Sequence, residues 1–319
     1  MKGIVMSFVR IAHFISIQLA IIVLALLMTK ASLADDMPDL YFVDAHSQMA
    51  KGLSSDKIIP LMDKAGVRHT ILSARNDRSP QDVADFAARH PDRITAAVRS
   101  KGRGFNFNKP NFQELINTQV SQPVFKAMAE AILYHAQKGR KAPEINVAID
   151  SPQSRVLLDI ALRKNWPYIA HYEFRAAKNR KETFLASFKK MARNHSGHPF
   201  VLIHMGQLYA ADVGQLIADH RNVYFMMSHS NPVSIAKNPG QPWANLFSGK
   251  KLADNWKALM LEHPDRFILT FDNVWPQDWG KSYLKQAALW RKALSTLPLD
   301  VAHALAHGNA ERLWRLPVP

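Results

Sequence analysis

The chain has 319 residues, no cysteine and a formal charge of +15 at pH 7. Without cysteine it has no disulfide, thiolate metal site or cysteine nucleophile, so any metal must be bound by histidine and carboxylate. Its 47% hydrophobic content suits a large core and argues against disorder. The basic residues are scattered and form no recognised nucleic-acid-binding motif, which favours a solvated basic surface over a nucleic-acid partner.

The first 34 residues are typical of an export signal. Lys2 and Arg10 give a basic start, Ile11 to Met28 is almost wholly apolar, and small residues lead up to Ala34. This pattern predicts a signal peptide, residues 1–34, cleaved after Ala34, and hence a periplasmic or secreted protein with no membrane segment after cleavage. Loss of its three basic residues leaves a charge of +12. A retained membrane anchor is the alternative, because the apolar run approaches the ~20 residues of a span.

The folded part opens with a β-prone run, Tyr41 to Gln48, that is apolar at first and polar at its end. Side chains alternate along an extended strand, so we expect Asp44, His46 and Gln48 on one side and the intervening residues on the other. A carboxylate, an imidazole and an amide at a strand end indicate a metal or acid/base site. A strand that runs into a polar turn is the alternative.

Apolar runs alternate with amphipathic helical patterns through the rest of the chain. Helix starts carry capping signals, such as Ser79 before Pro80. We expect helices at residues 55–65, 79–90, 112–120, 152–164, 182–193, 213–220, 255–262, 283–294 and 301–313. The expected strands are 41–48, 69–73, 94–98, the latter half of 125–135, 167–171, 199–204, 223–229 and 266–272, with long loops at 102–110, 139–151 and 231–249. A helix is the alternative for the latter half of 125–135.

Eight nearly continuous apolar strands separated by helices predict an α/β protein with parallel strands buried on both faces. Eight such units over residues 35–319 are typical of a single (β/α)8 TIM-like barrel. A doubly wound open sheet is the alternative, and it is disfavoured because no glycine-rich phosphate loop follows the first strand.

Polar side chains end most of the expected strands. The fourth strand contains Glu130, and the later four end at His171, His204, His229 and Asp272. The C-terminal ends of barrel strands share one mouth, where the active sites of such barrels lie. A single histidine is more often structural than a ligand, but this repetition on independent strands indicates a functional site at the mouth.

Five short motifs resemble the amidohydrolase superfamily, in particular its amidohydrolase-related (amidohydrolase 2) branch of TIM-barrel metal-dependent hydrolases. The motifs lie on the first, fifth, sixth and eighth expected strands and on the final helix, so the resemblance covers essentially the whole chain after residue 34. They are Val43-Asp-Ala-His46, Ile169-Ala-His171, Leu202-Ile-His204, Thr270-Phe-Asp272 and Gly308-Asn-Ala-Glu-Arg-Leu313.

The resemblance implies one divalent metal ion, usually zinc, that activates water or polarises the substrate. It implies that His46 and His171 are metal ligands and that Asp272 is a ligand or the base that takes a proton from water. His204 is expected to bind a second metal or to act as an acid/base group. Glu130 falls near the position where some relatives have a bridging ligand.

The chain departs from the family at Gln48, where the usual first-strand pattern, His-x-His, has its second histidine. A neutral amide oxygen is a poorer zinc ligand than imidazole, so a one-metal site is expected rather than a two-metal site. Gln48, Arg75 and His229 are expected to contact the substrate. Arg75 and Arg99 end the second and third strands, where a guanidinium can receive a substrate carboxylate.

The leading hypothesis is therefore a hydrolase of a C–O or C–N bond, as in an ester, a lactone or an amide, acting on a small molecule. Two alternatives remain: non-oxidative decarboxylation, as in other members of the family, and a degenerate barrel that only binds an anionic ligand. Gln48 is the residue that supports the second alternative. An aromatic cluster is expected to form the pocket floor and consists of Trp243, Phe247, Trp275 and Trp279.

Overall fold

The computed structural model describes residues 40–75, 78–139 and 142–317. The expected signal peptide and its cleavage site lie outside these ranges. Within them, no helix combines the length and apolar content that crossing a bilayer requires.

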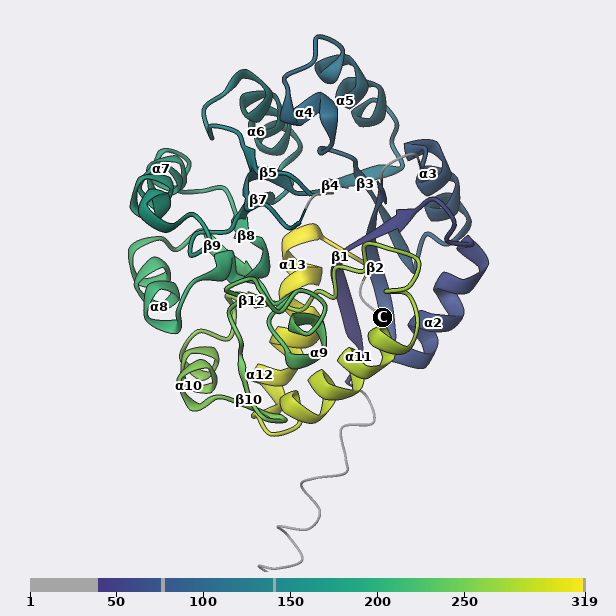
Figure 1. Ribbon diagram of the computed structural model, residues 1–319. Helices are drawn as coiled ribbons and strands as arrows, with labels where there is room; N and C mark the ends of the chain where they lie inside the picture. The colour runs from purple at the N-terminus through teal and green to yellow at the C-terminus, as the bar shows by residue number, and fades with distance from the viewer. Residues whose placement is uncertain (1–39, 76–77, 140–141, 318–319) are drawn as a thin grey trace, which may run out of the picture. The chain divides into compact units, whose positions relative to one another are not determined.

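The described residues form a barrel of parallel strands surrounded by helices (Figure 1). Hydrogen-bonded neighbours follow the order β1-β2-β3-β4 and then β5-β7-β8-β9-β12. The strands are β1 (Phe42–Ala50), β2 (Val67–Arg75), β3 (Ile94–Val98), β4 (Phe125–Met128), β5 (Ala131–His135), β7 (Tyr168–Tyr172), β8 (Phe200–Leu202), β9 (Val223–Met226) and β12 (Phe267–Ile268). Short antiparallel pieces, β6 (Ile145–Asn146), β10 (Phe247–Ser248) and β11 (Lys251–Leu252), lie in the connections.

Backbone hydrogen bonds close the sheet into a barrel at two places. β4 and β5 are halves of the fourth barrel strand, and the amide of Ala129, between them, donates to the carbonyl of Val98 at 3.0 Å. Beyond β12, the amide of Asp272 donates to the carbonyl of His46 at 3.0 Å, which joins the eighth strand position to the first. The alternative of an open doubly wound sheet is therefore wrong.

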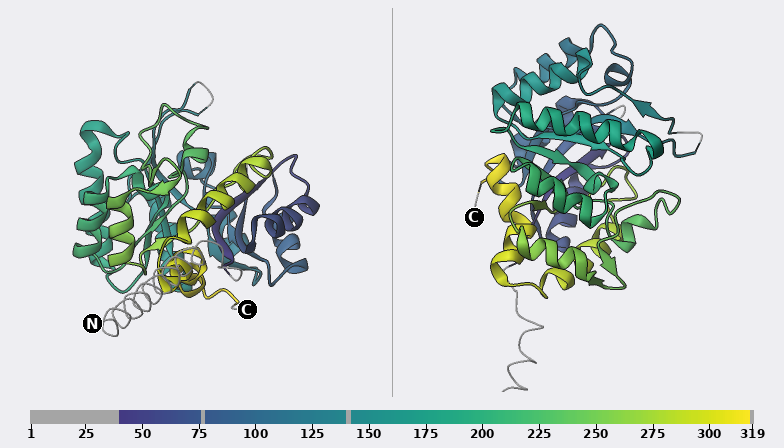
Figure 2. Two further views of the ribbon diagram at one scale, coloured as in Figure 1. Left: turned by 90° about the horizontal axis from the view of Figure 1, so that it is seen from below. Right: turned by 90° about the vertical axis from the view of Figure 1, so that its left-hand side faces the viewer.

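The helices lie outside the strands, as two further views show (Figure 2). They are α2 (Ile58–Ala65), α3 (Pro80–Arg89), α4 (Arg103–Asn106), α5 (Phe112–Val120), α6 (Pro152–Lys164), α7 (Lys181–Asn194), α8 (Ala210–Asp219), α9 (Pro232–Ile235), α10 (Asp254–Glu262), α11 (Lys281–Leu294), α12 (Leu299–His303) and α13 (Asn309–Trp314). The expected cap at Ser79 is confirmed, because its hydroxyl accepts from the amide of Gln81. Gly66, at φ 68°, ends α2 in a left-handed conformation that glycine adopts without strain.

Three expectations need correction. The expected loops at 102–110 and 231–249 contain the short helices α4 and α9. The final helix extends from Leu299 to Trp314, but a π-helical turn at Ala304–Gly308 interrupts its α-helical hydrogen bonds between α12 and α13. The eighth strand is regular only over Phe267–Ile268, because the next amide, that of Leu269, donates to the carbonyl of Leu305 in the π-helical turn instead of to a neighbouring strand.

One end of the barrel is closed by an apolar plug. Side chains from every barrel strand, including Val43, Ala97, Ile169 and Ile268, pack in one buried cluster with Trp314 of α13. Alternating inward residues fill a barrel of this size and leave no pore. The opposite end, where the strands terminate, is therefore the end that can hold a site.

His69 of β2 is buried in its neutral form, so we expect it to make the free energy of unfolding depend on pH. Its ring nitrogens contact the carbonyl of Asp92 at 3.1 Å and the hydroxyl of Thr95 at 2.8 Å. Burial lowers the pKa of His69 to about 4. The unfolded chain binds this proton near pH 6.5, so the stabilisation is complete above that pH and is lost as pH falls toward 4.

We therefore expect the wild-type protein to lose roughly 3 kcal/mol more than a His69→Gln variant between pH 7 and pH 4. Urea unfolding of both proteins at each pH measures the difference. Equal losses in the two proteins would contradict this role for His69.

Candidate functional site at the barrel mouth

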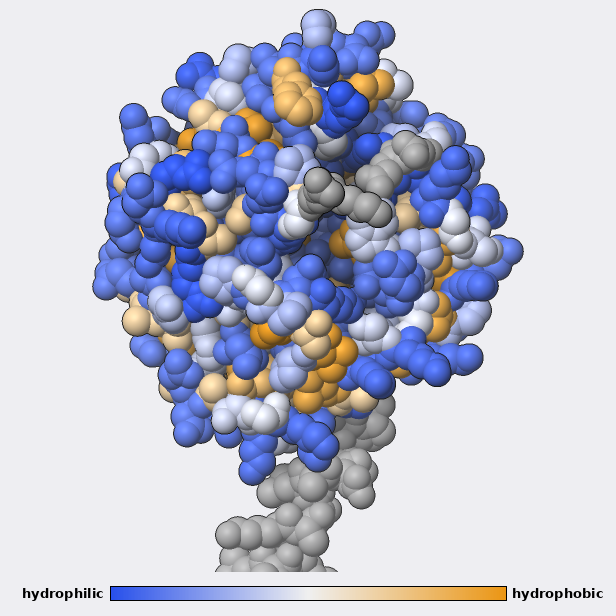
Figure 3. All heavy atoms as spheres, in the orientation of Figure 1, coloured by the Kyte–Doolittle hydropathy of each residue, from blue (hydrophilic) through white to orange (hydrophobic). Residues whose placement is uncertain are grey.

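A cavity of about 1350 Å³ opens at the C-terminal ends of the strands. Hydrophilic residues predominate around the hollow in this face (Figure 3). The cavity is lined by most of the expected site residues, namely Gln48, Arg75, Arg99, Glu130, His171, His204, His229 and Asp272. His46 is buried next to them, with Nε2 3.6 Å from Oε1 of Glu130. The structure thus brings His46 together with these cavity residues, whereas Asp44, which the sequence also placed at this strand end, does not line the cavity.

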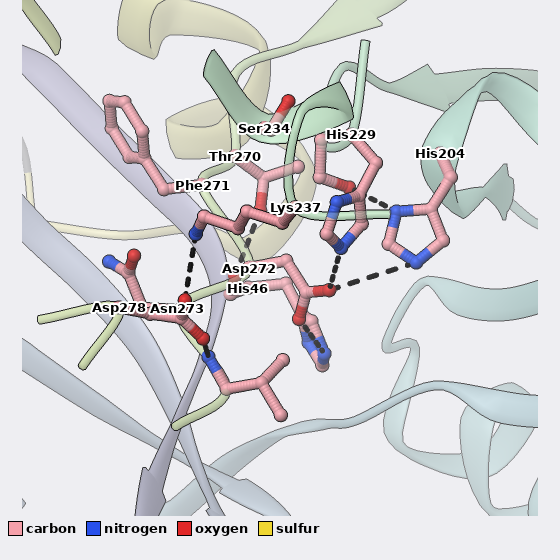
Figure 4. Close-up of polar contacts among 12 residues, drawn as sticks. His46, His204, His229, Ser234, Lys237, Thr270, Phe271, Asp272, Asn273 and Asp278 are labelled. Carbon is pink, nitrogen blue, oxygen red and sulfur yellow. Dashed lines mark hydrogen bonds and ion pairs between the residues drawn. The ribbon is translucent and has the colours of Figure 1, made fainter. Parts of the chain in front are cut away.

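Asp272 lies between three histidines from different strands (Figure 4). Its Oδ2 is 3.1 Å from Nε2 of His229 and 3.7 Å from Nε2 of His204, and its Oδ1 is 3.7 Å from Nε2 of His46. The hydroxyl of Ser228 contacts Nδ1 of His204 at 2.7 Å. This contact leaves Nε2 as the His204 nitrogen that faces Asp272.

Three of these residues have left-handed backbone conformations: His204 at φ 55°, His229 at φ 50° and Asp272 at φ 48°. They follow β8, β9 and β12, so three consecutive strand positions turn in the same way as they leave the barrel. Such conformations cost about 1 kcal/mol or more in a residue with a Cβ and cluster at functional sites. Nothing in the residue types signalled these conformations, and sequence reasoning missed them.

The expected alternation along β1 is wrong at Asp44. The pairing of β1 with β2 shifts register between Asp44 and Ser47, as a β-bulge does. The carboxylate of Asp44 accepts hydrogen bonds from the hydroxyls of Ser47 and Thr270 and from the amide of Phe271. Asp44 therefore fastens the first strand to the eighth, and only His46 and Gln48 of the three belong to the mouth.

Glu130 occupies the break between β4 and β5 and is the centre of a buried ionic network. Its Oε2 contacts Nδ1 of His171 at 2.6 Å, and its Oε1 pairs with the ammonium of Lys101, whose side chain is only 6% exposed. Nε2 of His171 lies 3.3 Å from Glu173, which also pairs with Lys138. Sequence reasoning missed Glu173, although its position two residues after His171 places it on the same side of the strand.

These contacts set the charges of the site. Burial alone would raise the pKa of Asp272, but the hydrogen bond from His229 and the nearby imidazoles hold this pKa well below its usual range. Burial would also raise the pKa of Glu130, but Lys101 and His171 together outweigh burial and lower this pKa. Burial and the neighbouring imidazoles lower the pKa of His204. At neutral pH the two carboxylates are ionised and His204 is neutral.

Gln48 is completely buried and links two charged groups. Its Nε2 donates to Oδ1 of Asp272 at 3.1 Å, and its Oε1 accepts from NH1 of Arg75 at 3.3 Å. The expected aromatic floor is only partly present. Trp243 stacks on His229 at 4.8 Å and Trp275 lies against Arg75. The other two do not line the cavity: Phe247 packs on Trp290, and Trp279 packs on Tyr283.

The donor set fits a divalent cation. Nε2 of His46 is buried without a hydrogen-bond partner, although Glu130 and Asp272 lie 3.6 and 3.7 Å away. Those separations are too long for hydrogen bonds and match the ~3.4 Å between two donors that each lie ~2.1 Å from one zinc ion. Among the described residues, two groups also place ligand atoms within 4.8 Å of one another: Glu130 with His171 and His204, and His204 with His229 and Asp272.

Comparison with known proteins finds matches among solved structures alone. No family model matches the chain, and no curated protein does. A zinc-bound amidohydrolase from Burkholderia multivorans is 17% identical, with 87% of this chain and 100% of that chain covered and a TM-score of 0.55. 4-Oxalomesaconate hydratase from Rhodopseudomonas palustris is 11% identical, with coverages of 86% and 95% and a TM-score of 0.53.

A third structure is a probable 2-pyrone-4,6-dicarboxylic acid hydrolase from Acinetobacter baumannii with citric acid bound. It is 12% identical, with 86% of this chain and 99% of that chain covered and a TM-score of 0.50. At these identities the likeness establishes the fold. One of these structural neighbours is named as an amidohydrolase, the family that the five sequence motifs resemble.

Proposed function

We propose that the protein is a metal-dependent hydrolase that cleaves a C–O or C–N bond of a small molecule, an ester, a lactone or an amide, at the barrel mouth. The observation that carries the proposal is the unpartnered, buried Nε2 of His46 between two ionised carboxylates, Glu130 and Asp272. A buried acceptor nitrogen costs free energy unless something binds it, and a cation satisfies the imidazole and both carboxylates at once.

His46, Glu130, His171 and Asp272 would hold the ion. Nε2 of His46 lies 3.6 and 3.7 Å from Glu130 and Asp272, and Nδ1 of His171 contacts the other oxygen of Glu130 at 2.6 Å, a hydrogen bond that binding of the ion would replace. A histidine and carboxylate set without cysteine suits zinc, and a structural neighbour contains zinc. When bound, a divalent ion supplies Lewis acidity and makes water a better nucleophile at neutral pH.

The chain itself supplies proton transfer and orientation. His204 is neutral, and Ser228 occupies its Nδ1, so its Nε2 is the atom that accepts a proton from the attacking water. The same Nε2 then returns this proton to the leaving oxygen or nitrogen. Asp272, 3.7 Å from that nitrogen, stabilises the imidazolium formed between the two steps.

Elemental analysis and a substrate panel test the proposal. We expect about one equivalent of zinc or another divalent metal per chain. We also expect the protein to hydrolyse at least one member of a panel of esters, lactones and amides, and a chelator should abolish this activity. His46→Ala should lose the metal, whereas a control variant, His263→Ala outside the mouth, should retain it. Absence of metal, or turnover that survives chelation, would refute the mechanism. Release of carbon dioxide from a carboxylic acid without hydrolysis would show a decarboxylase instead.

A further inference from the structure

Arg75 is a cation at the mouth that lacks an acidic partner among the described residues. It ends β2 and lines the cavity, and none of those residues offers a hydrogen-bond partner to its buried Nε. Within residues 40–75, 78–139 and 142–317, no carboxylate lies within ion-pair distance of its guanidinium. A half-buried charge without a counter-charge is costly unless a ligand supplies one.

The three lysines that line the cavity each pair with a carboxylate. Lys101 pairs with Glu130, Lys138 pairs with Glu173, and Lys237 pairs with Asp278 at 2.8 Å. Burial lowers the pKa of Arg75 even though Glu130, Asp272 and Asp278 act in the opposite direction from a distance. Compared with these lysines, the half-buried guanidinium of Arg75 is the cation whose charge an incoming anion would balance most.

Two contacts hold the guanidinium in place. NH1 donates to Oε1 of Gln48 at 3.3 Å, and the group lies 4.7 Å from the ring centre of Trp275. A guanidinium group that is already fixed by stacking and by one hydrogen bond loses little conformational entropy when its remaining N–H groups bind a carboxylate.

Both polar groups of the Gln48 side chain already form hydrogen bonds in this arrangement. An amide binds a metal through its carbonyl oxygen, and that oxygen accepts the hydrogen bond from Arg75. Its NH2 group donates to Asp272. A second metal ion at Gln48 would have to displace the guanidinium and would face its positive charge.

We propose that Arg75 binds a carboxylate of the substrate and that Gln48 is a positioning residue for this guanidinium and not a metal ligand. The substrate would therefore belong to the class of carboxylate-bearing molecules. This inference rests on the proposed function only in placing the bound carboxylate beside the bond that is cleaved. A monoanion fits better than a phosphate dianion, because Glu130 and Asp272 are close enough to repel the second charge.

Binding titrations test the role of Arg75 without any chemistry. Acetate, succinate, glutarate and benzoate are titrated by calorimetry into the purified protein, beside their amides and inorganic phosphate. We expect at least one carboxylate to bind saturably and its amide not to bind. Arg75→Met should weaken that carboxylate roughly 10- to 100-fold, the loss of hydrogen bonds to a charged group. Arg103→Met, which removes an exposed arginine of the same cavity, should change binding by no more than about twofold.

A double-mutant cycle tests the role of Gln48. Gln48→Leu should weaken carboxylate binding several-fold with metal content unchanged, and in the Arg75→Met background it should have no further effect. Additive losses, or loss of metal from Gln48→Leu, would refute the positioning role. No carboxylate binding, tighter binding of phosphate, or equal losses in Arg75→Met and Arg103→Met would refute the role of Arg75. A protein that binds carboxylates but holds no metal would overturn the proposed function and leave this inference standing.

Discussion

Replacing Asp272 with asparagine is expected to lower kcat/KM for the best substrate of the panel by about 10³-fold or more. Both carboxylate oxygens are in use, Oδ1 toward Gln48 and His46 and Oδ2 toward His229 and His204. Asparagine removes the negative charge. It also replaces one of these oxygens, which accepts hydrogen bonds or would bind the metal, with an NH2 group that can only donate. The metal content should fall with the activity.

Steady-state kinetics and elemental analysis of the same preparation check this result. Asp265→Asn is the matched control, since that aspartate is exposed and pairs with the neighbouring Arg266, outside the mouth. The control should keep both activity and metal. An Asp272→Asn variant with activity within about tenfold of wild type would place the essential carboxylate elsewhere.

Replacing Glu130 with glutamine is expected to destabilise the fold by roughly 3–5 kcal/mol, the cost of removing one partner from a buried ionic network. Lys101 loses its counter-charge and His171 loses a hydrogen-bond partner, and each of these side chains is only 6% exposed. Urea unfolding measures the loss. Glu144→Gln is the control, because Glu144 pairs with Arg180 at the surface and should contribute about 1 kcal/mol or less.

A second variant separates the buried charge from other effects of the substitution. Adding Lys101→Met to Glu130→Gln removes the stranded ammonium and should recover part of the lost stability. If the double variant is as unstable as the sum of the two single variants, the pairing of Lys101 with Glu130 does not explain the effect.

Much of the site was predictable because parallel strands in a barrel all end at one face. His171, His204 and Asp272 are far apart in the sequence, yet each follows an apolar run, and that alone placed them together. The same argument located Glu130 on the fourth strand, although the break between β4 and β5 was not visible in the residue pattern.

Other features were not predictable from strand position, because they depend on backbone detail and on the reach of side chains. The bulge after Asp44 turns that residue away from the mouth, which an ideal period of two cannot anticipate. The pairing of Lys101 with Glu130 and of Arg75 with Gln48 joins neighbouring strands through long side chains. The sequence presented Gln48 as a poor substitute for a metal-binding histidine, whereas the structure shows that its side chain joins Arg75 to Asp272.

Anomalous diffraction at the zinc absorption edge, from crystals of the zinc-loaded protein, tests the central claim most directly. The account predicts one peak, within about 2.1 Å of Nε2 of His46 and bordered by Glu130 and Asp272, with Oε1 of Gln48 outside coordination distance and still bonded to Arg75. No peak at the mouth, or a peak coordinated by Gln48, would contradict it.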